Sequence, residues 1–69
     1  MGNLYSEERQ QQYIKYAVED IKQLEKDGVS TDDIWQGIYG FFLDAHFGHD
    51  LSRTLAIKAF RKAGYSVGE

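Results

Sequence analysis

Cysteine and proline are both absent from this chain of 69 residues. Without cysteine, the protein can form no disulfide and no thiolate metal site, and it has no cysteine nucleophile. A small secreted domain usually depends on such crosslinks because its hydrophobic core is small, so we expect a reducing, cytoplasmic environment. The absence of proline is typical of helices that are joined by short turns.

Long apolar segments and the motifs of common enzymes are also missing. No apolar run approaches the roughly 20 residues of a membrane-spanning helix, and the first residues lack the basic and apolar regions of a signal peptide. The sequence contains no phosphate-binding glycine loop, no dinucleotide-binding fingerprint and no nucleophile elbow. We therefore expect a protein with no membrane span, no cofactor and no enzymatic activity.

Capping residues divide the chain into three helices. Ser6 is a good N-cap for the first helix, and Ser30 or Thr31 for the second. Gly28 and Gly64 are good helix stops because glycine readily adopts the left-handed conformation. No strand signal occurs. We expect a single all-α domain over residues 1–69, with helices over about 6–27, 31–46 and 51–63 and a tail over 64–69.

The turn between the second and third helices carries a cluster of polar side chains. Gly48 is expected to end the second helix, and Asp50 or Ser52 is expected to cap the third. The four oxygen and nitrogen donors of this segment are Asp44, His46, His49 and Asp50. Because the turn interrupts the helix, these donors are not expected to converge, and we predict a polar turn rather than a metal site.

The second helix is expected to be apolar around more than half of its circumference. The side chains that fill this arc of roughly 200° are Ile34, Trp35, Ile38, Tyr39, Phe41, Phe42, Leu43, Ala45 and His46. Such a helix is either central in the fold or part of an interface. Gly37 and Gly40 weaken it by about 1 kcal/mol each relative to alanine, so we expect a second helix to approach them closely, or a bend.

Aromatic residues exceed what so small a core can bury. Ten of the 69 residues are Phe, Tyr or Trp, and the first helix adds a buried stripe of Ile14, Ala17, Val18, Ile21 and Leu24. Some large side chains must then reach the surface, where aromatics are typical of binding sites. We expect a partner-binding surface that includes Tyr16, Tyr39, Leu43 and Phe47. Ile57 and Tyr65 are further candidates, and a homodimer through the second helix would bury a similar set.

Charge is distributed unevenly along the chain. Residues 1–33 hold eight acids against four bases, whereas residues 51–69 hold four bases against one acid. The cationic surface expected on the third helix consists of Arg53, Thr54, Lys58, Arg61 and Lys62. These residues could bind an acidic surface of another protein or the phosphates of a nucleic acid. The sequence pI near 5.2 favours the protein partner, because nucleic-acid-binding domains usually carry a basic surplus.

Residues 51–65, which read LSRTLAIKAFRKAGY, resemble the second half of bacterial helix-turn-helix regulators. The resemblance covers fifteen residues and implies that the third helix would enter a groove of DNA. Two main hypotheses follow from the sequence. The first is a small regulatory or adaptor protein that modulates a partner protein stoichiometrically, and the alternative is a helix-turn-helix-like regulator. A structural subunit of a larger assembly is a third reading.

Overall fold

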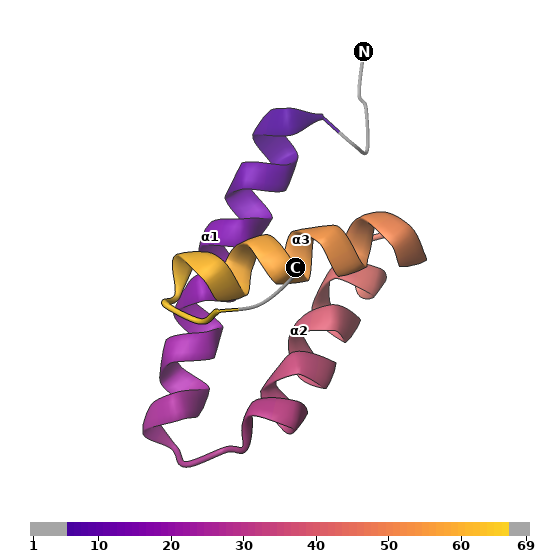
Figure 1. Ribbon diagram of the computed structural model, residues 1–69. Helices are drawn as coiled ribbons and strands as arrows, with labels where there is room; N and C mark the ends of the chain where they lie inside the picture. Colours follow the sequence, from indigo (N-terminus) through magenta and orange to yellow (C-terminus); the bar gives the residue numbers. More distant parts are fainter. Residues whose placement is uncertain (1–5, 67–69) are drawn as a thin grey trace.

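The computed structural model describes residues 6–66, which form three packed α-helices. Their bounds are Glu7–Lys26 for α1, Thr31–Asp44 for α2 and His49–Lys62 for α3. α1 and α2 diverge from the turn that joins them, and α3 crosses the space between them (Figure 1). Each helix contacts the other two. The predicted all-α, three-helix architecture is confirmed.

The first two helices begin where the sequence predicts. The Ser6 hydroxyl accepts a hydrogen bond from the Arg9 N–H at 3.2 Å, and the Ser30 hydroxyl accepts one from the Asp33 N–H at 3.3 Å. Each serine thereby satisfies a backbone donor that has no partner inside its helix. Two acidic residues follow each cap in the first turn, where they interact favourably with the positive end of the helix dipole.

α1 and α3 end in the same backbone motif, which includes an apolar contact. At the end of α1 the Val29 N–H donates to the Leu24 carbonyl at 3.1 Å, and at the end of α3 the Tyr65 N–H donates to the Phe60 carbonyl at 2.9 Å. The residue before each donor is a glycine at positive φ, 82° and 106° respectively. These are the glycine stops that the sequence predicts, and the side chain after each glycine is partly buried against the core.

The end of α2 differs from the prediction. The helix stops at Asp44 rather than near residue 46, and the residue at positive φ is His46 (φ 69°), so Gly48 is not the stop. The Phe47 N–H donates to the Phe42 carbonyl at 3.4 Å, and the two rings lie 6.0 Å apart. The same motif therefore forms with histidine in the glycine position. Phe47 is 2% exposed, and α2 ends at Asp44 because the chain must turn there to bury this ring.

α3 begins two residues earlier than expected. Gly48 occupies its N-cap position with φ 84° and ψ 166°, a conformation that is essentially restricted to glycine. Asp50 lies within the first turn, and Ser52 lies inside the helix with its side chain completely buried. Neither of the two predicted caps is used, because the unusual backbone of the glycine turns the chain directly into the helix.

An arginine connects the start of α1 to the end of α2. One Nη of Arg9 donates to the Ala45 carbonyl at 3.2 Å, and the guanidinium lies over the rings of Tyr13 and Phe47 at 4.8 and 5.5 Å from their centroids. The hydrogen bond satisfies a carbonyl that the end of α2 leaves without a helical partner. The same side chain covers Phe47, which explains why this aromatic residue is not at the surface.

The core lies where the three helices meet. Its largest fully buried side chains are Phe42 from α2 and Phe60 from α3. The remaining buried apolar residues are Ile14, Ala17, Ile21, Ile34, Ile38, Ala45, Phe47, Leu55, Ala56 and Ala59. Of the stripe predicted on α1, Val18 and Leu24 are only partly buried, because they lie at the edges of the core.

The two glycines inside α2 are not sites of close helix approach. A Cβ built at Gly37 or at Gly40 meets no atom within 4 Å outside its own helical backbone. The expectation that another helix packs against them is therefore wrong. α1 and α3 pack instead on the opposite side of α2, which presents Ile34, Ile38 and Phe42.

Replacement of Gly37 by alanine should raise the free energy of unfolding by about 0.5–1 kcal/mol, because alanine loses less backbone entropy in a helix and its Cβ has room here. Gly48→Ala is the matched control. It adds the same methyl group at positive φ and should lower stability by about 1–3 kcal/mol. Urea unfolding followed by far-UV circular dichroism measures both values. A destabilised Gly37→Ala variant would contradict the open surface on this side of α2.

Replacement of Ser52 by alanine should also stabilise the fold, by about 1 kcal/mol. Its hydroxyl oxygen is buried and has no hydrogen-bond partner in the described part of the chain, so its desolvation is uncompensated. Thr54→Ala is the control, since the exposed Thr54 hydroxyl donates to the Asp50 carbonyl at 3.2 Å and its removal should change stability by less than about 0.5 kcal/mol. Thermal unfolding of the two variants compares them directly, and a loss of stability in Ser52→Ala would contradict this account.

Candidate binding groove between α1 and α3

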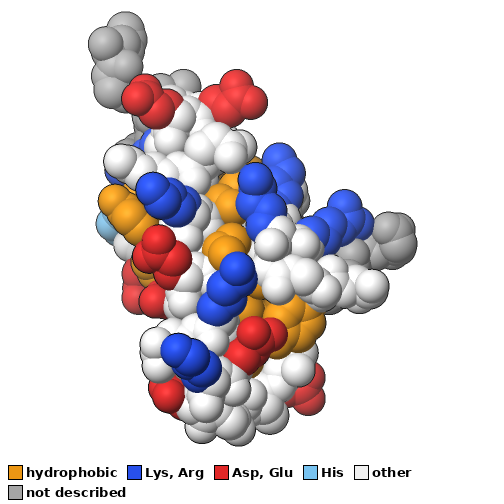
Figure 2. Space-filling model, turned by 90° about the vertical axis from the view of Figure 1, so that its left-hand side faces the viewer, with side chains coloured by type: hydrophobic (Ala, Val, Ile, Leu, Met, Phe, Trp, Pro, Cys, Tyr) orange, Lys and Arg blue, Asp and Glu red, His pale blue; other side chains and the backbone are white. Residues whose placement is uncertain are grey.

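A groove with a volume of about 460 Å³ opens between α1 and the last turn of α3. Its lining residues are Gln11, Ile14, Lys15, Val18 and Glu19 from α1 and Lys62 from α3. Figure 2 views the molecule from this side and shows apolar atoms exposed between charged side chains. We call this region the α1–α3 groove.

The floor of the α1–α3 groove is an open edge of the core. Ile14 and Val18 are one helical turn apart on the same side of α1. Ile14 is buried, whereas Val18 is only half-buried, because the end of α3 does not cover it. Water therefore reaches the Val18 side chain, next to the buried Ile14, on a concave surface, and an apolar concave surface with a few polar groups is the usual composition of a binding site.

Lys15 on α1 and Lys62 on α3 border this floor, and the other lysines lie farther along the same two helices. Lys15, Lys22 and Lys26 fall within an arc of about 40° on one side of α1, at 100° per residue. On α3, Lys58 lies one turn before Lys62 and on the same side. These five are all the lysines of the chain, and none forms an ion pair with another described residue.

One acidic residue belongs to the lining. Glu19 lies one turn after Lys15 on the outer side of α1, so the lining holds two lysines against one glutamate. Its carboxylate is exposed and makes no hydrogen bond to a described residue. The α1–α3 groove therefore keeps a positive charge in a chain whose formal net charge is −3.

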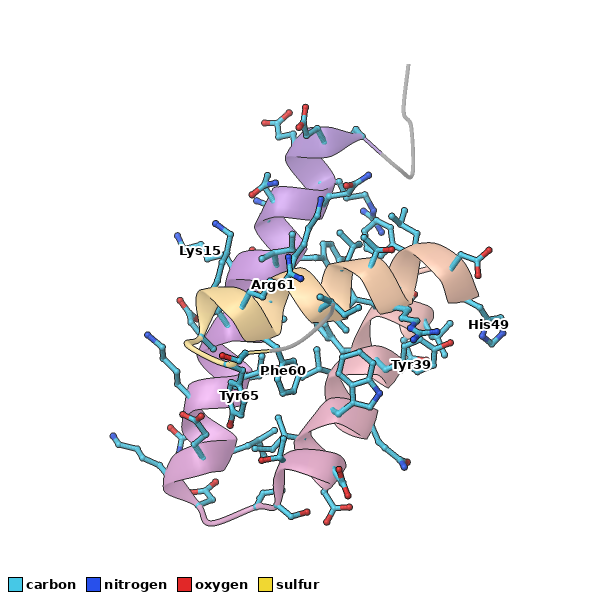
Figure 3. The ribbon with its side chains drawn as sticks, in the orientation of Figure 1. Lys15, Tyr39, His49, Phe60, Arg61 and Tyr65 are labelled. Carbon is cyan, nitrogen blue, oxygen red and sulfur yellow. The ribbon has the colours of Figure 1, made fainter. Side chains whose placement is uncertain are left out.

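A second group of aromatic side chains lies at the other end of α3. The Tyr39 hydroxyl and the His49 Nδ1 are 3.0 Å apart, and the Trp35 ring is nearly parallel to the Tyr39 ring, with centroids separated by 6.3 Å. Figure 3 shows Tyr39 and His49 together beside the start of α3, far along the helix from Tyr65. His49 thus pairs with a tyrosine, and no cluster of three metal-ligating side chains occurs within residues 6–66.

Tyr65 lies at the C-terminal end of α3, next to the turn between α1 and α2. Its ring packs edge-on against Phe60 at 4.9 Å, and hydrogen bonding to the Glu25 carboxylate raises the pKa of its hydroxyl. The tail predicted over 64–69 therefore begins too early, because Gly64 and Tyr65 belong to the end of α3. Residues 67–69 lie outside the described part of the chain.

The predicted aromatic surface is only partly exposed. Tyr16 is 47% exposed and is the large apolar side chain that is most open to solvent in the described chain. Tyr39 and Leu43 are half-buried. The expectation that Phe47 lies at the surface is wrong, since it is 2% exposed beneath Arg9. Tyr16 and Tyr39 lie outside the α1–α3 groove, so the predicted residues do not form one site.

All five predicted residues of the third helix are exposed, but they divide between its two sides. Lys62 lines the α1–α3 groove and Lys58 lies beside it, whereas Arg53 lies on the side of α3 that faces α2. Five residues of α1 line the groove although none was predicted as a site residue: Gln11, Ile14, Lys15, Val18 and Glu19. A signal was present, because the lysines of the first helix recur at helical spacing next to its apolar stripe.

Comparisons with protein-family models, with curated protein sequences and with solved structures find no match to this chain. No helix among residues 6–66 combines the length and the apolar character that crossing a membrane requires.

Truncation of Phe47 should test its placement most directly. Phe47→Ala should lower the free energy of unfolding by about 3–5 kcal/mol, because it removes a buried ring and leaves a cavity. Tyr16→Ala removes a half-exposed ring that packs in an edge-to-face arrangement with Tyr13, and should cost less than about 1 kcal/mol. Thermal unfolding followed at 222 nm measures both, and equal effects would contradict the assignment of Phe47 to the core and of Tyr16 to the surface.

Proposed function

We propose that this chain is a small, non-enzymatic regulatory or adaptor protein of the cytoplasm, which binds another protein stoichiometrically through the α1–α3 groove. The observation that carries the proposal is an apolar floor, formed by the buried Ile14 and the half-buried Val18, that lies between Lys15 of α1 and Lys62 of α3. Aliphatic side chains bind a partner by burying its apolar surface, and ammonium groups bind its carboxylates through charge-assisted hydrogen bonds. Such a lining suits a partner with both apolar and acidic groups.

The helix-turn-helix-like alternative is favoured by one observation. Residues 45–48 join α2 to α3, and a turn of three or four residues with a glycine is typical of that motif. The acidic pI of the chain argues against nucleic-acid binding, because the phosphates are negatively charged. Contacts to phosphates would also leave the apolar floor of the groove without a role. We therefore keep nucleic-acid binding as the second candidate.

Charge reversal on both sides of the α1–α3 groove tests the proposal. The wild-type chain and a Lys15→Glu/Lys62→Glu variant are immobilised in parallel, and the proteins that each retains from an extract of the native cells are quantified. We expect a partner that the wild type retains and the variant loses by at least about tenfold. Arg53→Glu is the matched control, because it reverses a charge on the other side of α3 and should retain the partner.

Two outcomes would contradict the proposal. Equal retention by the wild type and the double variant would exclude the α1–α3 groove as the contact surface. Binding to random duplex DNA at about 50 mM salt that weakens steeply towards about 200 mM would favour the nucleic-acid alternative. Light scattering completes the test, since a mass of twice 7.9 kDa that falls to the monomer in the double variant would identify the partner as a second copy.

A further inference from the structure

We infer that the occupant of the α1–α3 groove is an acidic amphipathic α-helix of the partner protein. The inference rests on the proposed function and adds the chemistry and the secondary structure of the bound segment. Three features lead to it: the lysines on both walls of the groove, the length of the lysine row on α1, and the backbone of the helices that form the walls.

The lysines define the charge of the occupant. The ammonium groups of Lys15 and Lys62 stand on opposite helices with the apolar floor between them, and Lys58 extends the row on α3. None of these groups has an acidic partner among the described residues. A bound segment with carboxylates along both edges of an apolar stripe would pair with both rows at once, whereas a segment acidic on one edge would leave one row uncompensated.

The direction of the occupant follows from the lysines of α1. Lys15, Lys22 and Lys26 lie on one side of that helix over roughly 16 Å, at 1.5 Å per residue. Figure 2 shows cationic side chains farther down this face, with acidic side chains between them. A segment that runs along α1 would therefore meet lysines over about three helical turns. A segment that crosses α1 at the groove would meet only Lys15 among the lysines of α1.

The backbone of the groove favours a helix over an extended strand. Both walls are α-helices, whose N–H and C=O groups are already paired within each helix. A strand laid on them would find no backbone partners and would place its own polar groups against Ile14 and Val18 at a cost in desolvation. A helix satisfies its own backbone and presents apolar side chains at positions i, i+3 or i+4, and i+7.

Selection from a peptide library provides the test. A display library of random peptides of about 16 residues, roughly four helical turns, is selected on the full-length wild-type chain and counter-selected on the Lys15→Glu/Lys62→Glu variant. We expect the enriched peptides to carry net negative charge, apolar residues at helical spacing and acids on both sides of that stripe. Enrichment of neutral or basic peptides, of strand-like alternation or of no sequence at all would overturn the inference.

The binding position is then checked with the best enriched peptide. Amide chemical shifts of ¹⁵N-labelled protein should move mainly at Ile14, Val18 and Lys62, and the affinity should fall at least about tenfold in the double variant but remain within about twofold in Arg53→Glu. Shifts centred on the Tyr39–His49 group would overturn the inference. A native partner that depends on Lys15 and Lys62 but binds through a different kind of segment would leave the proposed function intact and reject the helical occupant alone.

Discussion

The apolar contact across each helix end is the constraint on which the rest of the structure depends. At all three helix ends the N–H after a left-handed residue donates to the carbonyl five residues before it, and the side chain of that donor is at least partly buried against the core: these donors are Val29, Phe47 and Tyr65. These contacts set where the chain leaves each helix and in which direction it continues. Gly48 and the hydrogen bond from Arg9 to the Ala45 carbonyl add to this constraint at the turn between α2 and α3. The position of α3 relative to α1, and with it the α1–α3 groove, depends on the two turns that precede α3 and on the core that the three helices share.

The sequence predicts the fold well where a local signal and burial agree. Ser6 and Ser30 cap their helices as expected, and glycine with a following apolar residue marks the ends of the first and third helices. At the end of the second helix the two diverge. Gly48 is the obvious local stop, but burial of Phe47 makes His46 adopt the left-handed conformation instead. That outcome depends on Arg9, 36 residues away from Ala45 along the chain, so no local pattern contains it.

The candidate site was harder to predict than the fold. The net charge of a segment of sequence does not show on which side of a helix its charged residues lie. The first 33 residues are acidic in sum, yet Lys15, Lys22 and Lys26 gather on one side of α1. Helical periodicity could have revealed that row. It could not have revealed that Lys62 stands opposite, since this depends on the angle at which α3 crosses α1.

The distribution of the acids gives the lysine rows their significance. Five of the eleven acidic residues lie in first helical turns, at Glu7, Glu8, Asp32, Asp33 and Asp50, where the helix dipole stabilises them. These acids stabilise the helix N-termini, whereas Glu19 lies beside Lys15 in the lining of the α1–α3 groove. An acidic partner would therefore be attracted to one face and repelled from the helix N-termini. In the proposed complex this arrangement would restrict the orientation of the partner more than it would raise affinity, because repulsion at wrong surfaces contributes to specificity as much as attraction at the right one.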